Sequence, residues 1–165
     1  MLDMTKIENK SLKLDKESFN LIEEMQNVIK DFSSELSKEK IQLVFTSSQK
    51  EPILVNADKV RISEVISNLL GNAIKFTTKE AGRSITIKAE KRDNKANVSI
   101  KDTGSGIGPE IMPKLFSKFA TNSSGGTGIG LFISKSIIGA HGGRTWAENN
   151  SDGKGASFLF SLPLN

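Results

Sequence analysis

An amphipathic helix is predicted between Asp58 and Phe76, and its apolar face is broad enough to require a large surface to pack against. The apolar positions recur at the spacing of an α-helix; they are Val60, Ile62, Val65, Ile66, Leu69, Leu70, Ala73 and Ile74. Asn68, Asn72 and Lys75 follow the same spacing beside this face and not within it. The helix therefore has to cover a core while it presents three polar side chains to a common neighbour.

Segments of strand character surround this helix. IQLVFT and EPILVN precede it, SITIKAEK and ANVSIKD follow it with a hairpin at Asp93 and Asn94, and RTWAEN and ASFLFSLP close the chain. Further helices are predicted from Ser18, taken as an N-cap, to about Lys38, and over residues 128–140. This alternation predicts an α+β fold with a layer of helices on one face of a mixed sheet.

The composition fits one ordinary globular domain. The chain has 165 residues, of which 36% are hydrophobic and 25% charged, and such a chain is long enough to bury one core. It contains no cysteine, which excludes disulfides, thiolate metal ligands and cysteine nucleophiles. No apolar run approaches the roughly 20 residues that cross a bilayer, and the first residues lack the basic-then-apolar layout of a signal peptide.

The net charge of +4 does not by itself indicate binding to nucleic acid. The lysines are interspersed with acidic residues, as in SLKLDKESF and SELSKEK. Tyrosine is absent and there is one tryptophan, so no aromatic platform is interleaved with basic residues. We therefore expect a solvated surface of mixed charge and no nucleic-acid partner.

The polar stripe on the helix has two interpretations. The amide oxygens of Asn68 and Asn72 suit Mg²⁺, which borrows further oxygens from phosphates, and the Lys75 ammonium can pair with those phosphates. A solvated helix face with no ligand is the alternative, and the stripe alone does not separate the two.

The segment DTGSGIG, residues 102–108, places Asp102 at the end of a strand. A carboxylate there can accept a hydrogen bond from an exocyclic amine such as that of adenine, and the glycines let the backbone pass close to a flat base. A strand-to-helix turn with Asp102 as a cap remains an equal alternative.

The segment GGTGIG, residues 125–130, precedes a predicted helix. Its backbone amides and the helix dipole favour an anion such as phosphate. It is not a Walker loop, because GxxxxGK[ST] is missing, and not a dinucleotide fingerprint, because it follows a polar loop instead of a strand.

Taken in order, these segments resemble the ATP-binding catalytic domain of sensor histidine kinases, within the GHKL group of ATPases. NLLGNAIKFT resembles the N box of that family, DTGSGIG its G1 box, LFSKF its F box and GGTGIGL its G2 box. The resemblance continues through ISKSIIGAHGGRTWAENN and GKGASFLFSLP, so it covers nearly all of the chain from about Ser18. It implies a two-layer α/β sandwich in which a mixed, mostly antiparallel sheet of about five strands packs on three helices.

The resemblance also implies roles for single residues. Asn72 is the expected Mg²⁺ ligand, with Asn68 assisting at the metal or its waters, and Lys75 is expected to touch phosphate; Asn68 and Lys75 are the expected catalytic residues. Asp102 is expected to read the adenine amino group of ATP, and Ser157 to hydrogen bond near the adenine. The residues expected to shape or contact the rest of the site are Gly104, Gly106, Ile107, Gly108, Phe116, Phe119, Gly126, Thr127, Gly128, Ile129, Gly130 and Leu131.

Two features refine the expected activity. ATP-hydrolysing relatives such as the chaperone type carry Glu at the position of Asn68, and an amide cannot replace that base, which favours transfer to a protein side chain over hydrolysis. The family frequently has Arg or Lys just after the F-box phenylalanines, whereas this chain has Ala120 and Thr121 and an uncharged TNSSGG segment. Discrimination of the γ-phosphate is therefore expected to be weak or to come from a partner.

The acceptor histidine is expected to lie outside the chain. The sole histidine, His141, precedes Gly142 at a predicted helix end and is interpreted as structural. Residues 1–16 are expected to be the tail of a dimerisation and phosphoacceptor hairpin with its linker, and residues 17–165 the catalytic domain.

The expected partners follow from the same resemblance: the histidine-containing dimerisation domain of the same kinase, the receiver domain of a response regulator, and a second copy of the parent kinase as a homodimer. We expect a cytoplasmic domain without direct membrane contact, in a parent protein that can itself be membrane-anchored. The alternatives are a nucleotide-binding regulatory module, favoured by the uncharged segment, and a protein serine kinase of the same fold.

Overall fold

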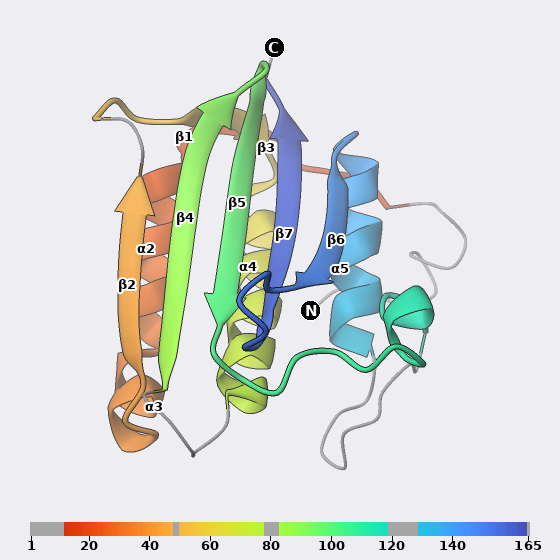
Figure 1. Cartoon of the computed structure of the whole chain (residues 1–165). Helices are drawn as coiled ribbons and strands as arrows, with labels where there is room; N and C mark the ends of the chain where they lie inside the picture. Colours follow the sequence, from red (N-terminus) through yellow and green to blue (C-terminus); the bar gives the residue numbers. More distant parts are fainter. Residues whose placement is uncertain (1–11, 48–49, 78–82, 119–128, 165) are drawn as a thin grey trace.

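A five-stranded mixed sheet forms one layer of the molecule (Figure 1). A computed structural model describes residues 12–47, 50–77, 83–118 and 129–164. In spatial order the strands are β2 (Gln42–Ser47), β4 (Ser84–Arg92), β5 (Lys95–Asp102), β7 (Ala156–Pro163) and β6 (Arg144–Asn149). β2 runs parallel to β4, and the other neighbours are antiparallel. The expected mixed, mostly antiparallel sheet is confirmed.

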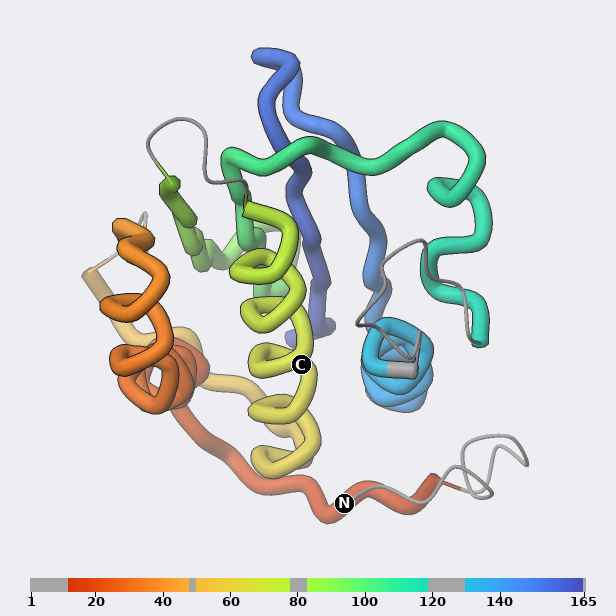
Figure 2. The backbone as a smooth tube through the Cα atoms, turned by 90° about the horizontal axis from the view of Figure 1, so that it is seen from below, coloured from red at the N-terminus to blue at the C-terminus, as the bar shows by residue number. Residues whose placement is uncertain are grey.

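Helices form the second layer and cover one face of this sheet (Figure 2). They are α2 (Leu21–Asp31), α3 (Ser33–Lys38), α4 (Lys59–Phe76) and α5 (Ile129–Ala140), and a short 3-10 helix η1 spans Met112–Lys114. A separate two-stranded antiparallel sheet pairs β1 (Glu17–Asn20) with β3 (Leu54–Ala57). The expected α+β sandwich is confirmed, with α2, α4 and α5 as the three main helices.

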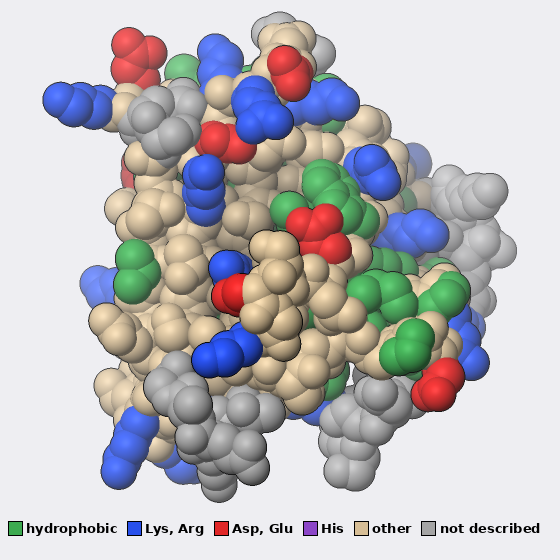
Figure 3. Space-filling view, in the orientation of Figure 1, with side chains coloured by type: hydrophobic (Ala, Val, Ile, Leu, Met, Phe, Trp, Pro, Cys, Tyr) green, Lys and Arg blue, Asp and Glu red, His purple; other side chains and the backbone are tan. Residues whose placement is uncertain are grey.

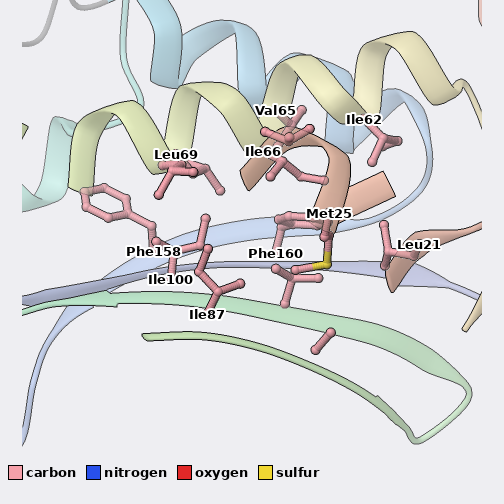
Figure 4. Packing of buried hydrophobic residues seen from close by; sticks show 14 of the residues in the cluster. Leu21, Met25, Ile62, Val65, Ile66, Leu69, Ile87, Ile100, Phe158 and Phe160 are labelled. Carbon is pink, nitrogen blue, oxygen red and sulfur yellow. The ribbon is translucent and has the colours of Figure 1, made fainter. Parts of the chain in front are cut away.

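The core lies between α4 and the inner face of the sheet (Figure 4). Alternate residues of β4 and β5 point inward, including Ile87 and Ile100, and both are fully buried. The apolar face of α4 meets them with Ile66 and Leu69, which are also fully buried. Burial of this face fixes the rotation of α4, and so determines where the polar stripe beside it points.

The beginning of the chain differs from the prediction of one helix starting after Ser18. Ser18 lies in β1 opposite Asn56, and the helix begins only at Leu21. Its N-cap is Asn20, whose Oδ1 accepts a hydrogen bond from Ile22 N at 3.1 Å. The helix is interrupted at Phe32 before α3 starts. Pairing with a strand far along the chain outweighs the local helical pattern here.

The predicted hairpin at Asp93 and Asn94 is present between β4 and β5. Both residues have positive φ values, 54° and 58°, as a two-residue turn matching the twist of antiparallel strands requires. This turn sets the register in which Ile85 lies opposite Asp102. It thereby places Asp102 at the end of the strand on the buried side.

The other face of the sheet carries no helix and presents a mixed-charge surface (Figure 3). Its basic side chains are interspersed with acidic ones, and several form ion pairs, such as Lys88 with Glu90 at 3.7 Å and Lys101 with Asp152 at 3.8 Å. Exposed pairs of this kind contribute little to stability. Among the described residues, no helix combines the length and apolar character needed to cross a bilayer.

Candidate functional site

Asp102 ends β5 and is completely buried. Its Oδ1 accepts hydrogen bonds from the N–H groups of Gly104 at 2.8 Å and Ala156 at 3.2 Å. Its Oδ2 is also buried but has no hydrogen-bond partner in the described part of the chain. Because buried polar atoms are nearly always paired, this unpaired Oδ2 is a candidate acceptor for a water molecule or a ligand.

The electrostatic state of Asp102 follows from the same surroundings. Burial raises the pKa of this carboxyl above its usual value, and the hydrogen bonds from Gly104 and Ala156 lower it in part. A donor that approaches Oδ2 would stabilise the ionised form further. The carboxylate therefore discriminates in favour of a ligand that brings an N–H group and against one that brings an acceptor.

The turn after Asp102 touches the end of α4. At Gly104 a Cβ atom would overlap the carbonyl oxygen of Phe76, so only glycine lets the turn and the helix meet. Gly106 has a φ of +81°, which also favours glycine. From here the chain crosses the end of α4 and runs to η1 on the side of α5 (Figures 1 and 2). The turn thus lies against the end of α4 and leads the chain toward the side of α5.

Ser157 is linked to this turn through Asn150. The Ser157 hydroxyl donates to Asn150 Oδ1 at 2.6 Å, and Asn150 Nδ2 donates to the carbonyl oxygen of Asp102 at 2.9 Å. Asn149 binds the backbone of Ile107 at the same end of the sheet. The sequence interpretation missed Asn149, Asn150 and Gly155; their signal was a run of asparagine and glycine at the end of a predicted strand.

Asn68 joins the two helices that border the site. Its Nδ2 donates to the carbonyl oxygen of Gly130 at 3.2 Å and to Ser134 Oγ at 3.3 Å, both in α5. A carbonyl oxygen only accepts, so the amide nitrogen of Asn68, and not its Oδ1, makes the hydrogen bond to Gly130. Asn68 can therefore tie α4 to the first turn of α5 and still offer an oxygen ligand.

The remaining residues of the polar stripe are placed differently. Asn72 is half-buried, one turn further along α4. Lys75 is exposed, with Nζ 5.8 Å from the Phe76 ring centroid. Lys75 and Ser105 line a cavity of about 740 Å³, which neither Asn68 nor Asn72 lines. The structure thus brings Asn68 to α5 and places Lys75 at the outer end of the helix.

The other predicted site residues fall into two groups. Leu131 is buried, Phe116 and Ile107 are half-buried against the core, and Gly108 accepts the backbone hydrogen bonds that begin the turn before η1. Four predicted residues lie outside the described part of the chain: Phe119, Gly126, Thr127 and Gly128. Ile129 is described only as the first residue of α5.

His141 closes the opposite end of α5 and has the structural role that the sequence indicates. Its Nδ1 lies 2.8 Å from the carbonyl oxygen of Ile137, and its Nε2 accepts a hydrogen bond from Asp58 N at 3.0 Å. Asp58 caps α4 through Arg61 N, and its Oδ2 accepts from Asp15 N at 2.9 Å. The neutral ring of His141 therefore joins α5 to the start of α4, at the residue that also holds the incoming chain.

We expect stability to depend on pH through His141. Burial lowers the pKa of this histidine below 6.5, as does the charge of Lys16, whereas the hydrogen bond to Ile137 and the charge of Asp58 raise it. As the pH falls, the unfolded chain therefore binds a proton at His141 before the folded chain does. The stability that is fully present above about pH 6.5 is then lost as the pH falls through the folded pKa.

Urea unfolding at pH 7.5, 6.5 and 5.5 measures this effect. We expect the free energy of unfolding of the wild type to fall along this series and that of His141→Asn to depend less on pH. At pH 7.5 we also expect His141→Asn to be less stable than the wild type by about 1–2 kcal/mol. An equal pH dependence in both proteins would contradict the assignment.

A comparison with protein families identifies the family of this chain. The family model described as histidine kinase-, DNA gyrase B- and HSP90-like ATPase matches residues 57–165. The sensor protein FixL of Bradyrhizobium diazoefficiens is 44% identical over 111 residues, which are 67% of this chain and 22% of FixL. The chain therefore corresponds to a limited part of the length of that relative.

Solved structures agree with this result. The nucleotide-free catalytic domain of the histidine kinase ThkA has a TM-score of 0.83 at 36% identity, over 91% of this chain and 96% of that one. ThkA in complex with the response regulator protein TrrA has a TM-score of 0.81 at 32% identity, over 98% of this chain and 46% of that one. The chain belongs to the family of histidine kinase-, DNA gyrase B- and HSP90-like ATPases. Within it, this chain has the fold of a histidine kinase catalytic domain, which is a nucleotide-binding fold.

Proposed function

We propose that this chain binds ATP together with Mg²⁺ and transfers the γ-phosphoryl group to a histidine on a dimerisation domain outside residues 17–165. The observation that carries the proposal is the buried Oδ2 of Asp102, which has no partner among the described residues. Adenine offers an exocyclic amino group that can donate to it, whereas guanine presents a carbonyl oxygen at the corresponding position. The site therefore favours adenine.

Asn72 and Asn68 are the residues suited to hold the metal ion. Their amide oxygens are hard ligands, and the hydrogen bond of Asn68 to Gly130 uses its Nδ2 and not its Oδ1. Mg²⁺, when bound, supplies charge that neutralises the phosphate oxygens. Lys75 is exposed and can extend toward phosphate from the end of the same helix. These roles are supported by the position of all three residues on α4.

Asn68 also bears on the fate of the phosphoryl group. An amide does not take up a proton from water at neutral pH, so Asn68 cannot act as a general base for hydrolysis. Its amide nitrogen is already engaged by Gly130 and Ser134. Catalysis by this domain then consists of positioning and charge stabilisation, with the nucleophile brought by the acceptor protein.

The partners belong to the same proposal. The extended residues 12–16 lead into β1, and we propose that they form the end of the linker from a dimerisation hairpin of the parent kinase, which acts as a homodimer. ThkA is a similar protein that forms a complex with a response regulator. We propose that the receiver domain of a response regulator takes the phosphoryl group from the acceptor histidine, and that the domain works in the cytoplasm.

The test combines binding with transfer. Calorimetry with ATP and GTP in the presence of Mg²⁺ is expected to show preference for ATP. Incubation with labelled ATP and a separately supplied histidine-containing dimerisation hairpin is then expected to give acid-labile label on the hairpin. Binding of ATP without any transferred label would contradict the kinase activity and favour a regulatory nucleotide-binding module, whereas acid-stable label on serine would indicate a serine kinase.

A further inference from the structure

The Asn149 side chain holds the Ile107 backbone by two hydrogen bonds. Its Oδ1 accepts from Ile107 N at 2.7 Å, and its Nδ2 donates to Ile107 O at 3.0 Å. The backbone N–H can only donate and the carbonyl can only accept, so this pair requires a side chain that offers both functions. An amide meets that requirement, and a carboxylate or an aliphatic side chain does not.

Asn149 occupies a fixed position from which to do this. It is the last residue of β6 and lies opposite Ala156 of β7. The N–H of Ala156 donates to Asp102 Oδ1, so the strand pair that carries Asn149 also binds the carboxylate proposed to read the base. The end of the β6–β7 strand pair therefore holds both Asp102 and Ile107, the two ends of this segment, in place.

Gly106 makes the contact possible. A Cβ atom at this position would lie 2.9 Å from Asn149 Oδ1, closer than real Cβ contacts occur, and Gly106 has a φ of +81°. Residues 105–108 have no helix or strand of their own. The two hydrogen bonds from Asn149 therefore hold a segment that has no regular secondary structure.

The double hydrogen bond limits what Ile107 can offer to a ligand. Asn149 uses the only backbone donor of Ile107 and one of the two lone pairs of its carbonyl oxygen, so the backbone of Ile107 has no N–H left for a base. Its half-buried side chain remains, and an aliphatic side chain suits packing against a flat ring. Asp102 then makes the polar contact with the base, and the side chain of Ile107 makes the apolar contact.

We propose that Asn149 is a positioning residue for adenine recognition, which clamps Ile107 so that its side chain and the Asp102 carboxylate face the same base. This inference rests on the proposed binding of ATP. It assigns to Asn149 an effect on nucleotide affinity and base preference, without contact with the nucleotide.

The test measures ATP and GTP affinity by calorimetry for the wild type, Asn149→Ala and the control Asn97→Ala. Asn97 is an asparagine of β5 with two long hydrogen bonds of 3.4 Å at the β4–β5 hairpin, outside the site. Loss of both clamp bonds is expected to weaken ATP binding about 5- to 30-fold, while GTP binding changes less than threefold and Asn97→Ala binds as the wild type. If Asn149 had a purely structural role, Asn149→Ala would weaken the binding of ATP and GTP equally, and that result would overturn the proposal.

A double-mutant cycle tests whether the clamp acts through Ile107. We expect Asn149→Ala to reduce ATP affinity much less in an Ile107→Ala background, because the side chain that the clamp positions is already missing. Equal effects in both backgrounds would overturn this route. If the wild type bound no ATP, the proposed function would fail and this assignment with it; if wild type and Asn149→Ala bound ATP equally, only the assignment would fail.

Discussion

Asp102→Asn is expected to weaken ATP binding about 10- to 100-fold, the loss associated with a hydrogen bond to a charged group. The substituted side chain has the same shape, and its carbonyl oxygen can keep the hydrogen bonds from Gly104 and Ala156. Its NH₂ group then takes the position of Oδ2 and faces the adenine amino group. Two donors oppose each other, so affinity falls while the turn keeps its conformation.

The stability of the same variant separates recognition from folding. Burial raises the pKa of Asp102, so ionisation of this carboxyl costs more free energy in the folded protein than in the unfolded chain. A folded pKa that is raised means that stability falls as the pH rises through it, and a neutral amide removes that dependence. We therefore expect Asp102→Asn to unfold at the same urea concentration as the wild type or at a higher one at pH 7.

Calorimetry with ATP and GTP measures the predicted loss, and Asp152→Asn is the matched control. Asp152 is exposed and pairs with Lys101 at 3.8 Å on the surface. The control should bind ATP as the wild type does. An unchanged preference for adenine over guanine in Asp102→Asn would show that Asp102 does not read the base.

Gly155→Ala is expected to destabilise the fold by about 2–5 kcal/mol, the sum of a left-handed backbone and a steric overlap. Gly155 has a φ of +74°, where an L side chain is strained. A Cβ atom there would also overlap the Asp102 carbonyl oxygen and lie 2.7 Å from its Oδ1. The substitution therefore pushes directly on the carboxylate.

Gly153→Ala is a close control for this prediction because it isolates the backbone effect. Gly153 has a φ of +79°, yet a Cβ atom added there would have no other atom within 4 Å. Urea unfolding should show a loss of about 1–2 kcal/mol for Gly153→Ala, with ATP affinity retained, and a larger loss with weakened ATP binding for Gly155→Ala. Equal losses of stability would contradict the close approach of Gly155 to Asp102.

The sequence was sufficient where local pattern and tertiary structure agree. The helical periodicity predicted a helix from Asp58 to Phe76, and α4 spans Lys59–Phe76 with Asp58 as its cap. The alternation around Asp93 and Asn94 likewise predicted β4, the turn and β5. In these segments the residues that favour the element are the residues that pack in the core.

Prediction was weaker where a residue depends on a distant partner. Ser18 has the features of an N-cap, but pairing of β1 with β3 uses that segment as a strand. Asn149 and Gly155 stand in a run of asparagine and glycine that does not reveal their partners, because their importance arises from contact with Ile107 and Asp102 more than forty residues earlier. Asp102 itself was predicted from its place before a glycine turn. Only the structure shows that it is buried and that its Oδ2 has no hydrogen-bond partner among the described residues.

The two ends of α4 serve different neighbours, and the length of the helix sets the distance between them. At its start, Asp58 holds Asp15 and His141; at its end, Phe76 abuts the turn that follows Asp102. An α-helix of 18 residues spans roughly 27 Å. Asp15 and the turn that follows Asp102 therefore lie at opposite ends of α4, which acts as a rigid spacer between them.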